Sequence, residues 1–99
     1  MKTLHLNLTK KWFDMILSGE KKEEYREQKP YWINRLVDKQ YSVIQFKNGY
    51  SKNAPFFLIE CNGISIGKPK GKWCDTAIDF DQDNGCYDDC FVIHLGVIV

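Results

Sequence analysis

The sequence predicts a single α+β domain over residues 1–99, built as a small mixed β-barrel with two short helices at its openings. Alternating apolar and polar residues recur in stretches typical of strands, and helical spacing recurs in two short segments. A hydrophobic content of 43% in 99 residues suffices for one core and leaves no room for a second. Because two helical connections are too few for a doubly wound sheet, a curled sheet is the expected architecture.

The chain is expected to begin with a strand and a short amphipathic helix. In residues 2–8 three leucines alternate with polar residues, which is typical of a half-buried strand. Thr9 suits the N-cap of the next helix, because its hydroxyl can accept a hydrogen bond from an early amide. Apolar residues recur at helical spacing over residues 10–18, and Gly19 suits the left-handed position that ends a helix.

A charged segment, residues 21–27, follows this helix. Its composition is poor for a strand, but a strand is expected because a helix cannot restart directly after the stop at Gly19. Pro30 then suits the first turn of a second helix over residues 30–38, where its fixed φ and missing N–H cost nothing. The charged segment is therefore expected to be a short strand between two helices.

Three further strands are expected to complete the sheet. Residues 41–50 alternate and end at an Asn-Gly turn, and residues 55–67 form a long strand that a second Asn-Gly pair bends or bulges. Residues 90–99 are apolar on both faces, as expected for a central or barrel-closing strand. Residues 67–89, rich in Gly, Lys, Asp and Asn, are expected to form a long irregular excursion.

The charge is distributed unevenly along the chain. Residues 1–50 hold ten Lys and Arg against six Asp and Glu, whereas residues 51–99 hold four against seven. The basic excess shares its half with the charged strand, which favours an anionic partner. Apolar runs too short to span a bilayer and the lack of a secretory signal predict no membrane partner. We expect a cytoplasmic location with reduced cysteines.

The charged strand offers a cluster of groups suited to binding. Alternate side chains of a strand share a face, so Glu24 and Arg26 are expected on one face. Glu23 and Tyr25 then take the other, and Lys21, at the turn after the helix, can join the first. Arg suits phosphate, Lys supplies a point charge or a base, and Glu accepts from a base edge. Alternatively, these charges form solvated pairs that serve only solubility.

The pattern Gly19-x-Lys21-x-x-Glu24-x-Arg26 resembles the G-x-K-x-x-E-x-R signature of the ASCH (ASC-1 homology) domain family, with all four positions matched. The resemblance extends to the preceding strand and helix, the "FKNGY" turn and the closing "FVIHLGVIV" strand. It implies a PUA-like barrel with a cleft beside the first helix that binds RNA or a nucleotide-like ligand. Lys21, Glu24 and Arg26 would line this cleft, and Gly19 would shape the turn.

The same resemblance leaves a small hydrolase as the alternative. Certain members of the family look like amidohydrolases acting on acylated cytidine, or like ribonucleases. Lys21 would then serve as the catalytic base and Glu24 as proton shuttle or water orienter. The amidohydrolase-type members carry Thr at the position of Glu24, so binding of RNA or a nucleotide is expected first. A third alternative is a protein-interaction domain whose charges form only a salt-bridged surface.

Other candidate ligand-binding residues are placed around the cleft by inference. Lys10 and Lys11 begin the first helix, where backbone amides and the helix dipole favour an anion. Trp12 and Tyr25 can stack on bases, although such residues more often serve as core or cover. Glu60, a lone carboxylate in an apolar strand, either faces solvent or pairs with a buried cation.

The sequence indicates no metal site and no cofactor. The Cys and His residues near the C-terminus superficially suggest zinc, but their spacing departs from the usual Cys pairs. Cys90 and His94 would also lie about 13 Å apart along one strand, at the usual rise per residue. Residues 79–89 resemble a calcium loop in composition but lack its closing Glu and its flanking helices.

Overall fold

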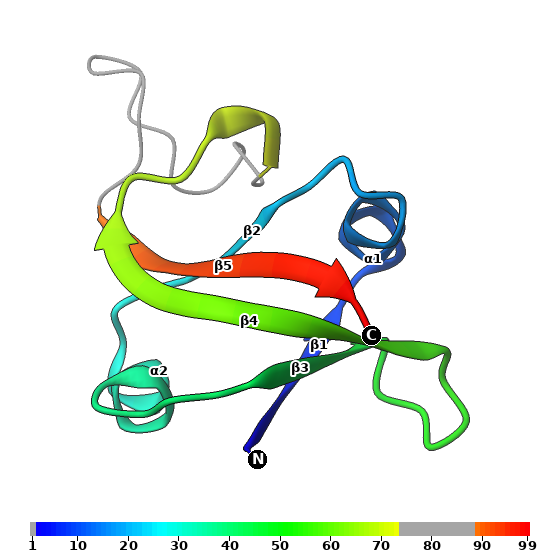
Figure 1. The fold of residues 1–99 in the computed structure, drawn as a ribbon, viewed down its shortest axis with the longest axis horizontal. Helices are drawn as coiled ribbons and strands as arrows, with labels where there is room; N and C mark the ends of the chain where they lie inside the picture. Colours follow the sequence, from blue (N-terminus) through cyan, green and yellow to red (C-terminus); the bar gives the residue numbers. More distant parts are fainter. Residues whose placement is uncertain (1, 74–88) are drawn as a thin grey trace.

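The computed structural model describes residues 2–73 and 89–99, in which five strands form one curled sheet (Figure 1). The sheet order is β1-β3-β4-β5-β2, with β1 parallel to β3 and the other neighbours antiparallel. The strands are β1 (Thr3–Leu8), β2 (Glu23–Arg26), β3 (Val43–Asn48), β4 (Phe56–Gly67) and β5 (Cys90–Ile98). The remaining elements are α1 (Lys10–Leu17), α2 (Pro30–Leu36) and a 3-10 turn, η1 (Gly71–Trp73). The predicted α+β class is confirmed.

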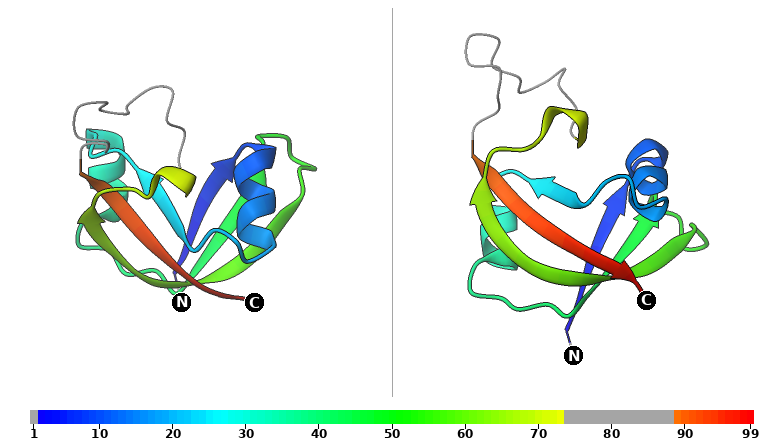
Figure 2. Two further views of the ribbon diagram at one scale, coloured as in Figure 1. Left: turned by 90° about the horizontal axis from the view of Figure 1, so that it is seen from above. Right: turned by 45° about the horizontal axis from the view of Figure 1, so that its top comes forward.

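The sheet curls into a half-barrel whose two edge strands are β1 and β2 (Figure 2). The two edges are tied together by a side chain, since Arg26 Nη2 donates a hydrogen bond to the backbone oxygen of Asn7 at 3.2 Å. A mixed β-barrel was predicted, but the described strands form a half-barrel, because no ladder joins β1 to β2 and this side-chain contact bridges the two edges. Beside this contact, the side chains of Glu24 and Arg26 on the edge strand β2 point into the half-barrel.

The core fills the inside of the curl. The leucines of β1 are buried because alternation turns them all to one face. α1 lays Phe13 against Phe57 of β4, with ring centroids 4.9 Å apart. Each such buried side chain contributes about 1.5–3 kcal/mol of burial free energy. The core consists of Leu4, Leu6, Leu8, Phe13, Ile16, Leu36, Ile44, Phe46, Phe57, Ile59, Phe91, Ile93 and Leu95.

The end of α1 delivers the chain to β2. Gly19 has a φ of 86°, the left-handed conformation that its lack of a Cβ permits, and so ends the helix as predicted. The amide of Lys21 then donates to the carbonyl of Met15 at 2.9 Å, which folds the chain back along the helix. Thr9 occupies the N-cap position, but its side chain makes no capping hydrogen bond. That part of the prediction is wrong.

β4 and β5 are the long strands that carry the curl. The register between them shifts between Ile59 and Cys61 and again between Cys61 and Ile64, and Gly63 has a φ of 117°. The predicted irregularity in this strand is therefore confirmed as a β-bulge, which bends the strand. β5 lies between β4 and β2, as expected for a central strand. Both faces are covered at its start, whereas Val97 near its end is 68% exposed.

The remaining predictions on the fold concern the second helix and the segment after β4. Pro30 begins α2 as predicted. The chain after Gly67 is irregular up to η1, and residues 74–88, the rest of the predicted excursion, lie outside the described residues. None of the described helices is long and apolar enough to cross a membrane.

Candidate functional site

Glu24 and Arg26 of β2 share one face, as the strand alternation predicts, and Lys21, just before the strand, joins them. Lys21 Nζ lies 2.9 Å from Glu24 Oε1, and Arg26 Nη2 lies 3.1 Å from Glu24 Oε2. Lys21 is only 2% exposed and Glu24 only 3%. The alternative of solvated surface pairs is therefore wrong for these residues, because β1, α1 and β2 enclose the face that they share.

The carboxylate of Glu24 is incompletely satisfied. Its Oε1 accepts hydrogen bonds from Lys21 Nζ at 2.9 Å and from the amide of Tyr25 at 3.1 Å. Its Oε2 has only the ion pair with Arg26, without hydrogen-bond geometry, and neither this oxygen nor Arg26 Nε has a hydrogen-bond partner in the described part of the chain. A buried acceptor and a buried donor thus each lack a hydrogen-bond partner among the described residues.

Aromatic rings lie next to both cations of this cluster. Lys21 Nζ lies 4.3 Å from the centroid of the Trp12 ring, and Arg26 Cζ lies 5.0 Å from that of Trp32. Both distances suit cation–π attraction, which strengthens when the cation has lost its water. Lys11 Nζ also lies 4.4 Å from the Trp12 ring, so an exposed ammonium accompanies the buried one.

A cavity of about 230 Å³ opens onto this cluster, and we call it the signature cavity. It lies where the end of β1 approaches β2, at the gap between the two edges of the half-barrel. Its walls combine the buried charges with indole and phenol rings. The lining residues are Asn7, Leu8, Thr9, Trp12, Lys21, Glu24, Tyr25, Arg26 and Trp73.

Three candidate residues lie outside this lining. Lys10 is exposed and pairs with Asp14 one turn along α1. Lys11 is exposed above the Trp12 ring, at the side of the cavity. Glu60 is exposed and accepts a hydrogen bond from the amide of Val97 at 3.1 Å. Of the two readings of Glu60 that the sequence left open, the structure has the solvent-facing one.

Residues that were not predicted complete the cavity. Trp73 is 6% exposed and reaches the lining from the end of the segment after β4. Asn7 contributes its backbone oxygen to Arg26, and Trp32 supplies the ring on which the Arg26 guanidinium rests. The only sequence signal for Trp73 was a large aromatic residue in an otherwise polar segment. Asn7 gave none, because any residue has a backbone oxygen.

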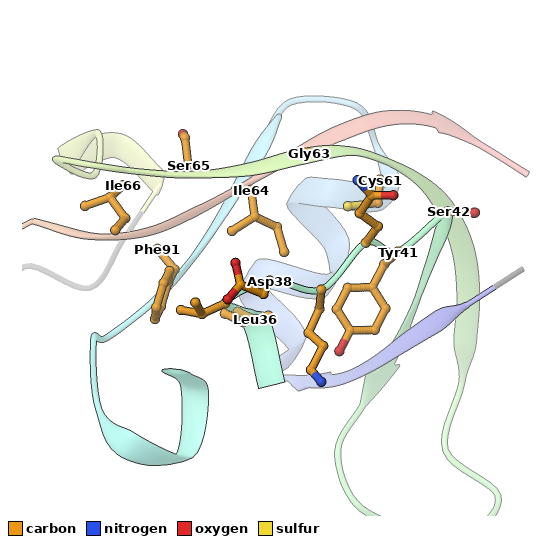
Figure 3. A pocket seen from close by; sticks show the side chains of 13 residues that line it. Leu36, Asp38, Tyr41, Ser42, Cys61, Gly63, Ile64, Ser65, Ile66 and Phe91 are labelled. Atoms are coloured by element: carbon orange, nitrogen blue, oxygen red, sulfur yellow. The ribbon is translucent and has the colours of Figure 1, made fainter. Parts of the chain in front are cut away.

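A larger hollow of about 620 Å³ lies elsewhere, between the segment after α2 and the bulged part of β4, and we call it the α2–β4 hollow (Figure 3). Leu36, Ile64 and Phe91 form its apolar floor, and Asp38 and Tyr41 lie at its side. Its charged residues, Asp38 and Lys39 among them, are exposed. None of the predicted site residues lines it. Of these two hollows, the smaller is the one with buried charged residues, Lys21 and Glu24, in its described lining, and we take it as the candidate site.

In residues 2–73 and 89–99, no three His, Cys, Asp or Glu side chains lie where they could together hold a metal ion. Cys74 and Cys86 of the rejected zinc pattern lie outside the described residues, and Cys61 carries a free thiol.

In comparisons with known proteins, no family model, no curated protein and no solved structure matches this chain.

Proposed function

We propose that this protein is a PUA-like domain of the ASCH type that binds RNA or a nucleotide in the signature cavity. The observation that carries the proposal is the carboxylate of Glu24, which lies buried between Lys21 and Arg26 while its Oε2 has no hydrogen-bond partner among the described residues. The match to the ASCH signature supports the same assignment. The cytoplasm is the location we propose for this activity.

A buried ion pair is weak evidence for a role in stability alone. Taking each ion out of water costs several kcal/mol, and well-packed apolar residues of similar volume are often as stable or more so. Lys21, Glu24 and Arg26 are nonetheless held at the wall of a cavity rather than in the packed core. This placement favours a role in which the charges meet a ligand.

The groups around the cavity suit the parts of a nucleotide. Glu24 Oε2 can accept a hydrogen bond from a base edge, and the indole of Trp12 offers a stacking surface. Arg26 can donate to a phosphate or sugar oxygen through its Nε, and Lys11 supplies exposed positive charge beside the Trp12 ring. The volume of about 230 Å³ is below the range of about 300–1,000 Å³ usual for drug-sized ligands, which suits the base of a nucleotide with its sugar and phosphate outside.

The rival proposal is a hydrolase that uses the same residues. The hydrogen bond of 2.9 Å between Lys21 and Glu24 favours it, because two groups at that distance can exchange a proton. Lys21 would then act as base and Glu24 as proton shuttle. The two proposals use the same cavity, and they differ in whether the bound molecule is hydrolysed there or released intact.

A titration of fluorescein-labelled, short single-stranded RNA of mixed sequence, followed by fluorescence anisotropy, tests binding. The variant Lys21→Met/Glu24→Leu removes the buried pair with no change in net charge. The matched control, Lys29→Gln/Glu27→Gln, removes an exposed pair, also without change in net charge. We expect the first variant to bind at least about tenfold more weakly, the loss of one charge-assisted hydrogen bond, and the control to bind as the wild type does. Circular dichroism checks that both variants are folded.

Equal loss of affinity in both variants, or no binding by the wild type, would contradict the proposal. The RNA recovered from the titration is then examined for cleavage, and acylated nucleosides are tested for turnover. Product formation that disappears in Lys21→Met/Glu24→Leu and persists in the control would move the site to the hydrolase.

A further inference from the structure

A short segment far along the chain covers the signature cavity. Residues 68–73, which we call the strap, leave the end of β4 and end in η1, which lies on the side of β2 nearest α1 (Figure 1). Trp73, the last residue of the strap, is buried and lines the cavity together with Trp12 of α1. Two segments remote in sequence thus each contribute an indole to one cavity.

The outward face of β2 holds the strap in place. The amide of Lys70 donates a hydrogen bond to Tyr25 Oη at 3.2 Å, and that hydroxyl donates to Glu23 Oε1 at 2.7 Å. Lys70 Nζ lies 3.5 Å from Glu23 Oε2, so the strap is joined to β2 through both its backbone and its side chain. The side chain of Glu23 is 17% exposed and that of Lys70 55%, so the carboxylate is partly shielded from water while the ammonium is not.

Glu23 is itself held by the neighbouring strands. His94 Nδ1 of β5 lies 3.8 Å from Glu23 Oε2, and His94 Nε2 lies 2.8 Å from Ser65 Oγ of β4. β5 pairs Glu23 directly with His94, which fixes their separation. The carboxylate that receives the strap is thus positioned by side chains from two further strands.

The strap also brings positive charge to its indole. Lys70 Nζ lies 4.9 Å and Lys72 Nζ 4.6 Å from the centroid of the Trp73 ring. Trp12 is accompanied by Lys11 in the same way, at 4.4 Å. An aromatic surface bordered by ammonium groups suits a ligand that joins a flat ring to a phosphate.

We infer that Trp73 is a second stacking surface for the base of the ligand, and that Glu23 and Tyr25 are positioning residues that hold it there. This inference rests on the proposed function. Glu24 and Arg26 then meet the ligand, while Glu23 and the hydroxyl of Tyr25, whose ring also lines the cavity, hold the strap.

Fluorine NMR of the full chain labelled with 5-fluorotryptophan tests the first part, because the chain has three tryptophans. Single Trp→Phe variants assign the three resonances. We expect short single-stranded RNA to shift the resonances of both Trp12 and Trp73. A shift of Trp12 without a shift of Trp73 would overturn the inference and leave the proposed function standing. No shift of either resonance at saturating RNA would contradict both.

A matched pair of tyrosine variants tests the positioning role. Tyr25→Phe removes the hydroxyl that joins Glu23 to the strap but keeps the ring, whereas Tyr41→Phe removes a hydroxyl that donates to the carbonyl of Arg35, at the α2–β4 hollow. We expect Tyr25→Phe to shift the Trp73 resonance of the free protein and to weaken RNA binding about fivefold, the effect of one hydrogen bond. Tyr41→Phe should change neither.

An unchanged Trp73 resonance in folded Tyr25→Phe, or weaker binding without that shift, would overturn the positioning role. Trp73→Leu gives a further check on the indole itself. It should lower RNA affinity at least about fivefold, since stacking on one ring is worth about 1–3 kcal/mol per base. Binding of RNA by Trp73→Leu as tight as by the wild type would overturn the stacking role.

Discussion

Two hollows of the described structure, the α2–β4 hollow and the signature cavity, differ in size and in how deeply their charged residues are buried. The α2–β4 hollow is the larger, about 620 Å³ against about 230 Å³, and its floor is apolar while Asp38 at its side is exposed. The signature cavity is small, but its walls include Lys21 and Glu24, which are almost completely buried. Volume alone would not single out the signature cavity.

The difference shows which observation identifies a binding site in a small domain. An apolar hollow beside a bulge follows from imperfect packing of a bent strand against a loop. Buried charges have no such ordinary origin, because each loses hydration that only a partner can replace. Each variant in or beside the signature cavity has a counterpart at or near the α2–β4 hollow, where the same kind of change should have little effect.

The largest effect is expected on stability when a carboxylate becomes an amide. Glu24→Gln leaves the ammonium of Lys21 buried without its counter-charge, which should cost about 3 kcal/mol of unfolding free energy. Asp38→Asn should stay within about 0.5 kcal/mol, because the side chain is exposed and Asn tolerates the φ of 57° at this position. Urea unfolding measures both. An equal loss of unfolding free energy in both variants would contradict the difference between the two hollows.

The next effect is expected on RNA affinity when an arginine becomes glutamine. Arg26→Gln removes the guanidinium next to Glu24 Oε2 and should weaken binding of single-stranded RNA by at least about tenfold, the value of a charge-assisted hydrogen bond. Arg35 rests on the ring of Tyr31, outside the cavity, and Arg35→Gln should leave the affinity unchanged. Anisotropy titrations with folded variants measure the two. A larger loss for Arg35→Gln would contradict the assignment.

The smallest effect is expected on the salt dependence of binding. Lys11 is exposed beside the Trp12 ring, so Lys11→Gln should lower the slope of log affinity against log salt by about 0.7, the value for one phosphate contact on a single strand. Lys39→Gln, at the α2–β4 hollow, should leave the slope unchanged. Titrations between about 50 and 200 mM salt measure it. Equal slopes for all three proteins would remove Lys11 from the phosphate contacts.

The elements that the sequence predicted well are those with strong local signals. The alternation in β1, the stop at Gly19 and the start at Pro30 depend only on near neighbours, and all three appear in the structure. The shared face of Glu24 and Arg26 followed from strand parity in the same way. The direction of Glu60 stayed open, because the residues before it are apolar on both faces of the strand, and it is the burial of Phe57 and Ile59 in the structure that puts Glu60 on the opposite face.

What the sequence could not predict depends on contacts between remote segments. Periodicity assigns a side chain to a face but does not say whether another element covers that face, so the burial of Lys21 was open. Trp73 reaches the cavity only because the strap crosses β2 and is held there by Tyr25. The backbone oxygen of Asn7 meets Arg26 only because the sheet curls until its edges approach.

Residue-resolved NMR with short single-stranded RNA tests the central claim most directly. Amide and side-chain shifts should concentrate around the signature cavity, at residues 7–12, 21–26 and 70–73, and should vanish in Lys21→Met/Glu24→Leu. The residues of the α2–β4 hollow should stay unmoved in both proteins. Shifts that concentrate at the α2–β4 hollow, or that persist unchanged in the variant, would contradict the account.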